Sequence, residues 1–253
     1  MRRLKENVLK ALILLSAIFT ISVLVVIVGF IIIKGISGIN FKYLTSDYSA
    51  GEGGGILSMI ITTLYTVFLS ILVATPVGVL AAIYLQEYAK KGKFVNSVRF
   101  ATESLAGIPS IVYGLFGGIF FVITLKMGYS ILAGSLTVSI IILPLIIRTT
   151  EESLKTVPIG YREASLAMGA TKFQTICKVI IPSAAPGILS GIILSIGRIV
   201  GESAAILLTA GTVAKMPTGI FDSARTLTVQ SYLLAKETGN IQAAASVGVV
   251  LIV

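Results

Sequence analysis

The sequence contains no histidine and no tryptophan, and its single cysteine is Cys177. A disulfide, a thiolate–imidazole pair and a metal site of cysteine and histidine are therefore excluded within this chain. The phosphate-binding pattern G-x4-G-K-[ST] is also absent. If ATP drives this protein, another polypeptide must bind the nucleotide. We accordingly expect no catalytic residue, no metal and no cofactor, and a protein that is not an enzyme.

Charged residues are also scarce. They make up 12% of the 253 residues, whereas 55% are hydrophobic and the mean hydropathy is +0.99. A chain this apolar is an integral membrane protein in contact with lipid. The net charge of +9 would suggest nucleic acid in a soluble protein. Here, however, the basic residues lie in short loops between apolar runs, where they set topology, so we expect no nucleic-acid partner.

Six apolar runs predict an all-α protein with six transmembrane helices in a single domain, because a bilayer core of about 30 Å needs roughly 20 helical residues. The runs cover residues of about 11–33, 56–85, 101–125, 131–147, 187–210 and 241–253. The third contains Gly107, Ile108 and Pro109, a sequence that favours a kink over a break. The sixth is too short to cross, so we expect that span to be incomplete.

Charge predicts the orientation of these spans. The loops 1–10, 86–99 and 148–186 hold thirteen Lys or Arg, whereas the loops on the opposite side hold six. Cytosolic loops carry the excess of basic residues. The sequence therefore predicts a multi-pass protein of the cytoplasmic membrane, with the N-terminus and loop 148–186 in the cytosol.

The longest polar interruption is residues 158–182, PIGYREASLAMGATKFQTICKVIIP, which we call the handle. Pro158 suits the start of a short helix, and Gly169 suits the left-handed residue that ends it. Thr171 and Gln174 have the spacing of a capping box at the start of a second helix. The handle is therefore predicted to be a pair of short helices joined by a glycine turn.

One face of the second handle helix is predicted to be apolar, because its hydrophobic residues recur with helical spacing. They are Phe173, Ile176, Cys177 and Ile180. Pro182 and Pro186 are expected to end this helix. From the pattern alone, a docking surface and a helix pair lying on lipid headgroups are both open.

The handle resembles the EAA loop of ABC-importer permeases, E-A-A-x3-G-x9-I-x-L-P. The residues at matching positions are Glu163, Ala164, Ser165, Gly169, Val179, Ile181 and Pro182. Ser165, Val179 and Ile181 replace the second alanine, the isoleucine and the leucine of that pattern. In the family this loop fits a cleft on the ATPase subunit, so the resemblance implies that Glu163, Ala164, Ser165, Gly169 and Pro182 couple this chain to an ATPase.

Two charged residues, Arg198 and Glu202, fall within the fifth apolar run, four residues apart on one face of the predicted helix. An ionisable group at the bilayer centre costs about 2.5–3.5 kcal/mol, so it faces a pore, a partner or a counter-ion. Either the two charges neutralise each other or they form a gate for an anion. Arginine suits an oxyanion, because its planar fork donates parallel hydrogen bonds. Glu103 and Arg148 lie near span ends, where long side chains reach the headgroups.

Three further segments, AGIPSIVYGLFG, LPLIIRTTEESLKTVP and GRIVGESAAILLTAG, resemble the permeases of phosphate-uptake ABC transporters. The RTTEE segment favours the PstA family over its sister PstC, and Ser203 stands where the family usually has threonine. The resemblance implies a type I importer permease that moves inorganic phosphate by alternating access past Arg198 and Glu202. It also implies a second, PstC-like permease, two cytosolic PstB-like ATPase subunits and an extracytoplasmic PstS-like phosphate-binding protein.

Two other functions remain open. One is the same architecture carrying another oxyanion, such as sulfate or molybdate. The other is an ion-coupled secondary transporter that uses Glu202 as a proton site. Against the latter, Arg198 would keep Glu202 ionised, and such a transporter has no use for the handle.

Overall fold

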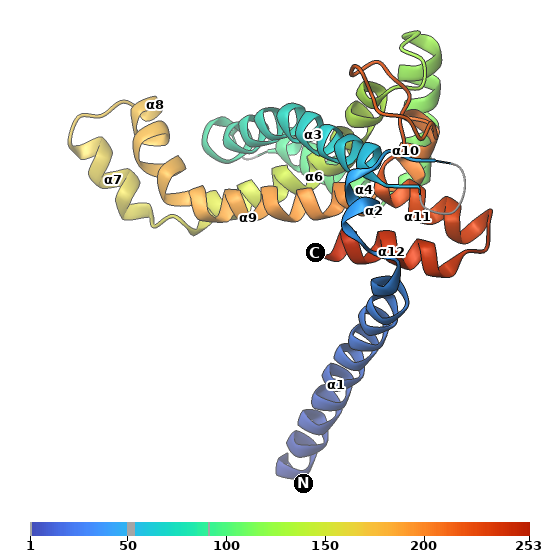
Figure 1. The fold of residues 1–253 in the computed structure, drawn as a ribbon. Helices are drawn as coiled ribbons and strands as arrows, with labels where there is room; N and C mark the ends of the chain where they lie inside the picture. Colours follow the sequence, from blue (N-terminus) through green and yellow to red (C-terminus); the bar gives the residue numbers. More distant parts are fainter. Residues whose placement is uncertain (1, 50–53, 91) are drawn as a thin grey trace.

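The computed structural model describes residues 2–49, 54–90 and 92–253, and within these ranges every regular element is a helix (Figure 1). The α-helices are α1 Arg2–Gly35, α2 Phe41–Thr45, α3 Leu57–Ile83, α4 Lys93–Ala106, α5 Ser110–Gly117, α6 Ile131–Thr156, α7 Ile159–Ala167, α8 Lys172–Thr175, α9 Ile181–Val200, α10 Ala204–Thr209, α11 Leu227–Lys236 and α12 Ile241–Ile252. A 3-10 turn η1 covers Ile36–Gly38, and three π-helical turns are η2 Tyr84–Tyr88, η3 Gly118–Thr124 and η4 Ile176–Ile180.

The long helices α3, α6 and α9 lie side by side and form the body of the molecule (Figure 1). Small residues allow their backbones to come close. Ser70 of α3 donates to the carbonyl of Ser135 at 3.0 Å, and Ser139 donates to the carbonyl of Ser70 at 3.2 Å. A buried cluster fills the space between the three helices: Ala74, Val138, Ile142, Ile146 and Ile199 are among its members.

The first helix, α1, extends away from this body (Figure 1). Residues Leu9–Gly38 form a continuous apolar stretch. The most apolar part of this stretch contains no buried residue, as expected for a helix surrounded by lipid. Its far end contacts α12, where Ser246 donates to the carbonyl of Gly35 at 2.8 Å. A side chain at Gly35 would collide with the backbone of Ala245, so glycine is needed for this approach.

Among the described residues, four helical segments are long and apolar enough to cross a membrane, or five if one bent pair counts as a single span. The bent pair is the third predicted run. It is broken rather than kinked, because α4 and the helix starting at Ser110 meet at 99°. Pro109 lacks an N–H and disfavours helical backbone at Ile108, which explains the break. Tyr113 bridges it by donating to the carbonyl of Leu105 at 2.7 Å.

The prediction for the fifth run, 187–210, was wrong at both ends. Pro182 and Pro186 do not end the helix but lie within it. The helix continues over Lys172–Val200 and joins the second half of the handle to α9, and the π-helical turn η4 just before Pro182 accommodates the missing proline N–H. The helix stops at Val200, and a break at Gly201 precedes α10. Likewise, α6 continues to Thr156, so the polar loop is shorter than 148–186.

A loop between α10 and α11 covers the N-terminal end of α6. The first amides of a helix lack partners within the helix. The amide of Ile131 donates to the carbonyl of Asp222 at 3.0 Å, and that of Leu132 donates to the carbonyl of Ile220 at 2.9 Å. The last predicted run forms α12, which packs on α11 and on α1.

Candidate functional site

The handle has the predicted helix–turn–helix form at one end of α9, remote from α10 and α11 (Figure 1). Gly169 has a φ of +83°, which confirms the left-handed turn. The capping box is also confirmed. The backbone N–H of Gln174 donates to Thr171 Oγ1 at 3.3 Å, and the side-chain Oε1 of Gln174 accepts from the backbone N–H of Thr171 at 2.9 Å. Local sequence therefore determines this turn.

The predicted apolar face of the second handle helix was only half right. Ile176 and Ile180 are buried in a cluster with Leu154 of α6, but Phe173 is 68% exposed and Cys177 is also exposed. The π-helical turn η4 begins at Ile176, and its wider i to i+5 spacing ends the 3.6-residue register on which the prediction for Cys177 rested. Phe173 precedes this turn and is exposed on α8.

No residue of α7 is buried, and its motif residues Glu163 and Ala164 are exposed. Met168, just after α7, is 88% exposed. Ser165 is half-buried, and its hydroxyl lies 2.9 Å from Thr175 Oγ1, which links α7 to α8. The exposed side of the handle therefore offers a polar and apolar surface without contacts to the rest of the described chain.

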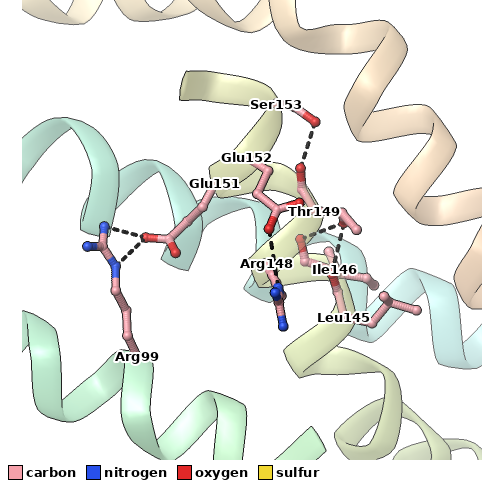
Figure 2. A network of polar contacts seen from close by, with 8 residues as sticks. All are labelled: Arg99, Leu145, Ile146, Arg148, Thr149, Glu151, Glu152 and Ser153. Atoms are coloured by element: carbon pink, nitrogen blue, oxygen red, sulfur yellow. Dashed lines mark hydrogen bonds and ion pairs between the residues drawn. The ribbon is translucent and has the colours of Figure 1, made fainter. Parts of the chain in front are cut away.

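A pocket of about 250 Å³ opens between α4 and α6 and reaches the end of α9. Its lining includes three arginines and three glutamates: Arg99, Arg148, Arg198, Glu103, Glu151 and Glu152. Figure 2 shows two of these arginines held by carboxylates. Arg99 of α4 pairs with Glu151 of α6 at 3.0 Å, and Arg148 pairs with Glu152 at 3.2 Å.

The two ion pairs differ in burial. The side chain of Glu151 is 8% exposed, whereas those of Arg148 and Glu152 are 65% and 60% exposed. The Arg148 pair is therefore more accessible to an incoming anion and is worth little by itself. The Arg99 pair, in contrast, holds α4 against α6.

Arg198 and Glu202 do not lie on one helical face, contrary to the prediction, because α9 ends at Val200 between them. In the part of the chain that the structure describes, no ion pair joins them. Arg198 is exposed in the last turn of α9 and lines the pocket. Glu202 lies in the break, and its Oε1 accepts from the amide of Ala205 at 3.1 Å. A carboxylate at this position accepts a hydrogen bond from an otherwise unpaired backbone N–H at the start of α10, and its negative charge interacts favourably with the helix dipole.

Sequence reasoning missed the contribution of Arg99 and assigned Arg148 to the headgroups. The i to i+4 spacing of Arg148 and Glu152 was visible in the sequence, but 52 residues separate Arg99 from Glu151 and no local pattern connects them. The described residues contain no group of three or more potential ligands that could hold a metal ion.

These features together define a class: an all-α, multi-pass membrane protein with a charged pocket and a projecting helix–turn–helix handle. Residues 74–253 match the family described as binding-protein-dependent transport system inner membrane component. The chain belongs to this family. It is thus an ABC-importer permease, a transport subunit rather than an enzyme, and it works with an ATPase and other subunits.

Individual relatives agree with the family. The probable ABC transporter permease protein YqgI of Bacillus subtilis is 37% identical over 211 residues, which cover 83% of this chain and 72% of that protein. The phosphate transport system permease protein PstA of Pasteurella multocida is 38% identical over 210 residues, covering 83% and 75%.

Solved structures support the fold alone. The inward-facing MetNI methionine ABC transporter has a TM-score of 0.62 at 24% identity, covering 78% of this chain and 86% of that chain. A bacterial ABC transporter for the acidic polysaccharide alginate has a TM-score of 0.67 at 16% identity, covering 99% and 94%. The predicted type I importer architecture is confirmed.

Proposed function

We propose that this chain is the PstA-type permease of an ATP-driven importer of inorganic phosphate. The observation that carries the proposal is the pocket into which Arg99, Arg148 and Arg198 converge from three helices. Guanidinium groups bind tetrahedral oxyanions through paired N–H donors and stay charged at any physiological pH. The similarity to proteins named phosphate transport system permease PstA supports the same substrate.

Within this proposal, Arg198 contacts the anion and Glu202 positions Arg198. Arg198 is exposed and lines the pocket, and in the described structure its guanidinium has no carboxylate within ion-pair distance. Glu202 fixes the break that ends α9 by accepting from Ala205. Both residues then belong to the substrate pathway. Arg198 contacts the anion directly, whereas Glu202 acts indirectly, by fixing the backbone that follows Arg198.

The handle docks the ATPase in this proposal, through Glu163, Ala164, Ser165, Gly169 and Pro182. The exposure of Glu163 and Ala164 supports this role, as does the turn at Gly169. The excess of basic residues in loops on the side of the N-terminus and the handle supports a cytosolic location for both. The remaining partners are a PstC-like permease, two PstB-like ATPase subunits and a PstS-like binding protein outside the membrane.

The experiment is uptake of radiolabelled phosphate into proteoliposomes that contain the complete complex with its ATPase and binding protein. We expect ATP-dependent uptake that unlabelled phosphate suppresses and that equal concentrations of sulfate or molybdate do not. Competition by sulfate or molybdate instead would assign another oxyanion. Uptake that follows a proton gradient without ATP would contradict the importer mechanism and favour a secondary transporter.

A further inference from the structure

Arg162 is the residue of α7 that reaches back into the body of the protein. Its side chain is 22% exposed, whereas its neighbours Tyr161 and Glu163 are exposed. The guanidinium donates to the carbonyls of Leu154 at 3.0 Å and Val157 at 3.1 Å. The last carbonyls of a helix lack partners within it, so Arg162 ties α7 to the end of α6.

The same guanidinium forms an ion pair with a residue far away in the sequence. Arg162 Nη2 lies 2.7 Å from Glu87 Oε1, and the side chain of Glu87 is 9% exposed. Glu87 belongs to η2, the last turn of the continuous helix Leu57–Tyr88 that begins as α3. A short, charge-assisted hydrogen bond in this sheltered position is strong and only weakly screened.

The second half of the handle is fastened to the same turn. Lys172, at the start of α8, donates its Nζ to the backbone carbonyl of Glu87 and lies 4.8 Å from the ring centroid of Tyr88. This cation–π contact adds a second attachment. Both helices of the handle therefore converge on residues 87 and 88, at a π-helical turn of the kind that often marks functional positions.

We infer that Glu87 is a positioning residue that transmits movement of the handle to α3. Because no residue of α7 is buried, apolar packing cannot hold α7 against the body, and the polar contacts of Arg162 must do so. Without the Glu87 side chain, the direct link from α7 to η2 is lost: Arg162 then holds α7 only to the end of α6, and Lys172 of α8 still contacts η2. Movement of α7 therefore reaches α3 less completely. This inference rests on the proposed docking of an ATPase on the handle.

The first test measures coupling in the reconstituted complex with Glu87→Ala, the conservative Glu87→Asp and the matched control Glu237→Ala, an exposed acid after α11. We expect the ATPase to stay bound and ATP hydrolysis to continue in all variants. The phosphate moved per ATP should fall about tenfold in Glu87→Ala, the worth of one charge-assisted hydrogen bond. Glu87→Asp should restore part of it, and Glu237→Ala should match the wild type.

A second readout does not depend on the substrate. In a Cys177→Ser background, Leu145→Cys places a thiol at the pocket lining, where a water-soluble maleimide can react. We expect ATP to change the labelling rate in the wild type and in Glu237→Ala, but not in Glu87→Ala. Labelling that responds to ATP without phosphate uptake would refute only the proposed substrate. A normal ATP response in Glu87→Ala, or loss of the ATPase from that variant, overturns the role of Glu87.

Discussion

The hydroxyl oxygens of Ser165 and Thr175 lie 2.9 Å apart and join the two helices of the handle. Ser165 stands where the EAA pattern has its second alanine, so the exchange adds a hydrogen bond to the turn. We predict that Ser165→Ala loosens α7 by about 1 kcal/mol, the usual net contribution of one hydrogen bond. Hydrogen exchange of the α7 amides should accelerate, and Thr175→Val should have the same effect. Unchanged exchange in both variants would show that the contact contributes nothing.

Gly169 and Gly160 provide a matched pair of glycines. A Cβ at either position would meet no atom within 4 Å, but only Gly169 has a positive φ. Gly169→Val should cost about 1–2 kcal/mol, because a Cβ is disfavoured in the left-handed region. We expect this variant to weaken ATPase co-purification, while Gly160→Val leaves it close to the wild type. Equal binding by both variants would contradict the proposed role of the turn in docking.

Arg99→Gln should destabilise the protein, because it leaves the nearly buried carboxylate of Glu151 without its partner. We expect a loss of about 1–3 kcal/mol in thermal or denaturant unfolding in detergent. The double variant with Glu151→Gln should recover part of this loss. The exposed pair of Arg148 and Glu152 is the control, and its removal should change stability by less than about 1 kcal/mol. Similar losses in the two pairs would show that burial does not distinguish them.

Substitutions at Arg198 and Glu202 separate anion contact from helix capping. Arg198→Gln should abolish phosphate uptake, alone and combined with Glu202→Gln, because nothing replaces the lost donors. Glu202→Gln alone should retain much of the uptake, since an amide oxygen still accepts from Ala205. The measurement is uptake by membranes that carry equal amounts of complex. Uptake near the wild-type rate in the double variant would leave Arg198 and Glu202 as structural residues.

Asp222 gives a pH-dependent prediction. Hydrogen bonds to its Oδ2 from the Thr218 hydroxyl and from the amides of Thr218 and Gly219 lower the pKa of its carboxyl. Because this pKa is lower in the folded protein, the carboxylate stabilises the loop at pH values above the usual pKa of aspartate. This contribution is lost as the pH falls through the pKa of Asp222 in the folded protein. Exchange of the Thr218 and Gly219 amides, corrected for intrinsic rates, should stay slow at pH 5 and accelerate at lower pH. Asp222→Asn should accelerate it at pH 5 and remove its dependence on pH, because asparagine has no carboxylate to protonate.

The turn of the handle was predictable because its contacts are local, whereas the pocket was not because its contacts are long-range. Gly169, Thr171 and Gln174 act within a few residues of one another, so their turn and capping box follow from spacing alone. Arg99 and Glu151 of the pocket are 52 residues apart, and only tertiary packing brings them together.

The break at Gly201 escaped prediction for another reason. Apart from Arg198 and Glu202, the run 187–210 has no charged residue and no proline to mark a break, and the capping role of Glu202 resembled that of a charge within a span. Pro182 and Pro186 led to the opposite error. Prolines are typical of a helix end, but here both lie inside a helix that continues from Lys172 to Val200, where a local π-helical turn accommodates them. π-helical turns such as η4 also shift the register in a way that a period of 3.6 residues cannot anticipate.

Helix α9 adjoins the handle at Ile181 and carries Arg198 near its other end. At 1.5 Å per residue, its 20 residues span about 30 Å. A tilt of roughly 8° about the middle of α9 would displace each end by about 2 Å, in opposite directions. The length of a guanidinium hydrogen bond is of similar size. A rigid tilt of this kind would therefore bring Arg198 within reach of a bound anion, or take it out of reach, with no change of helical structure anywhere along α9.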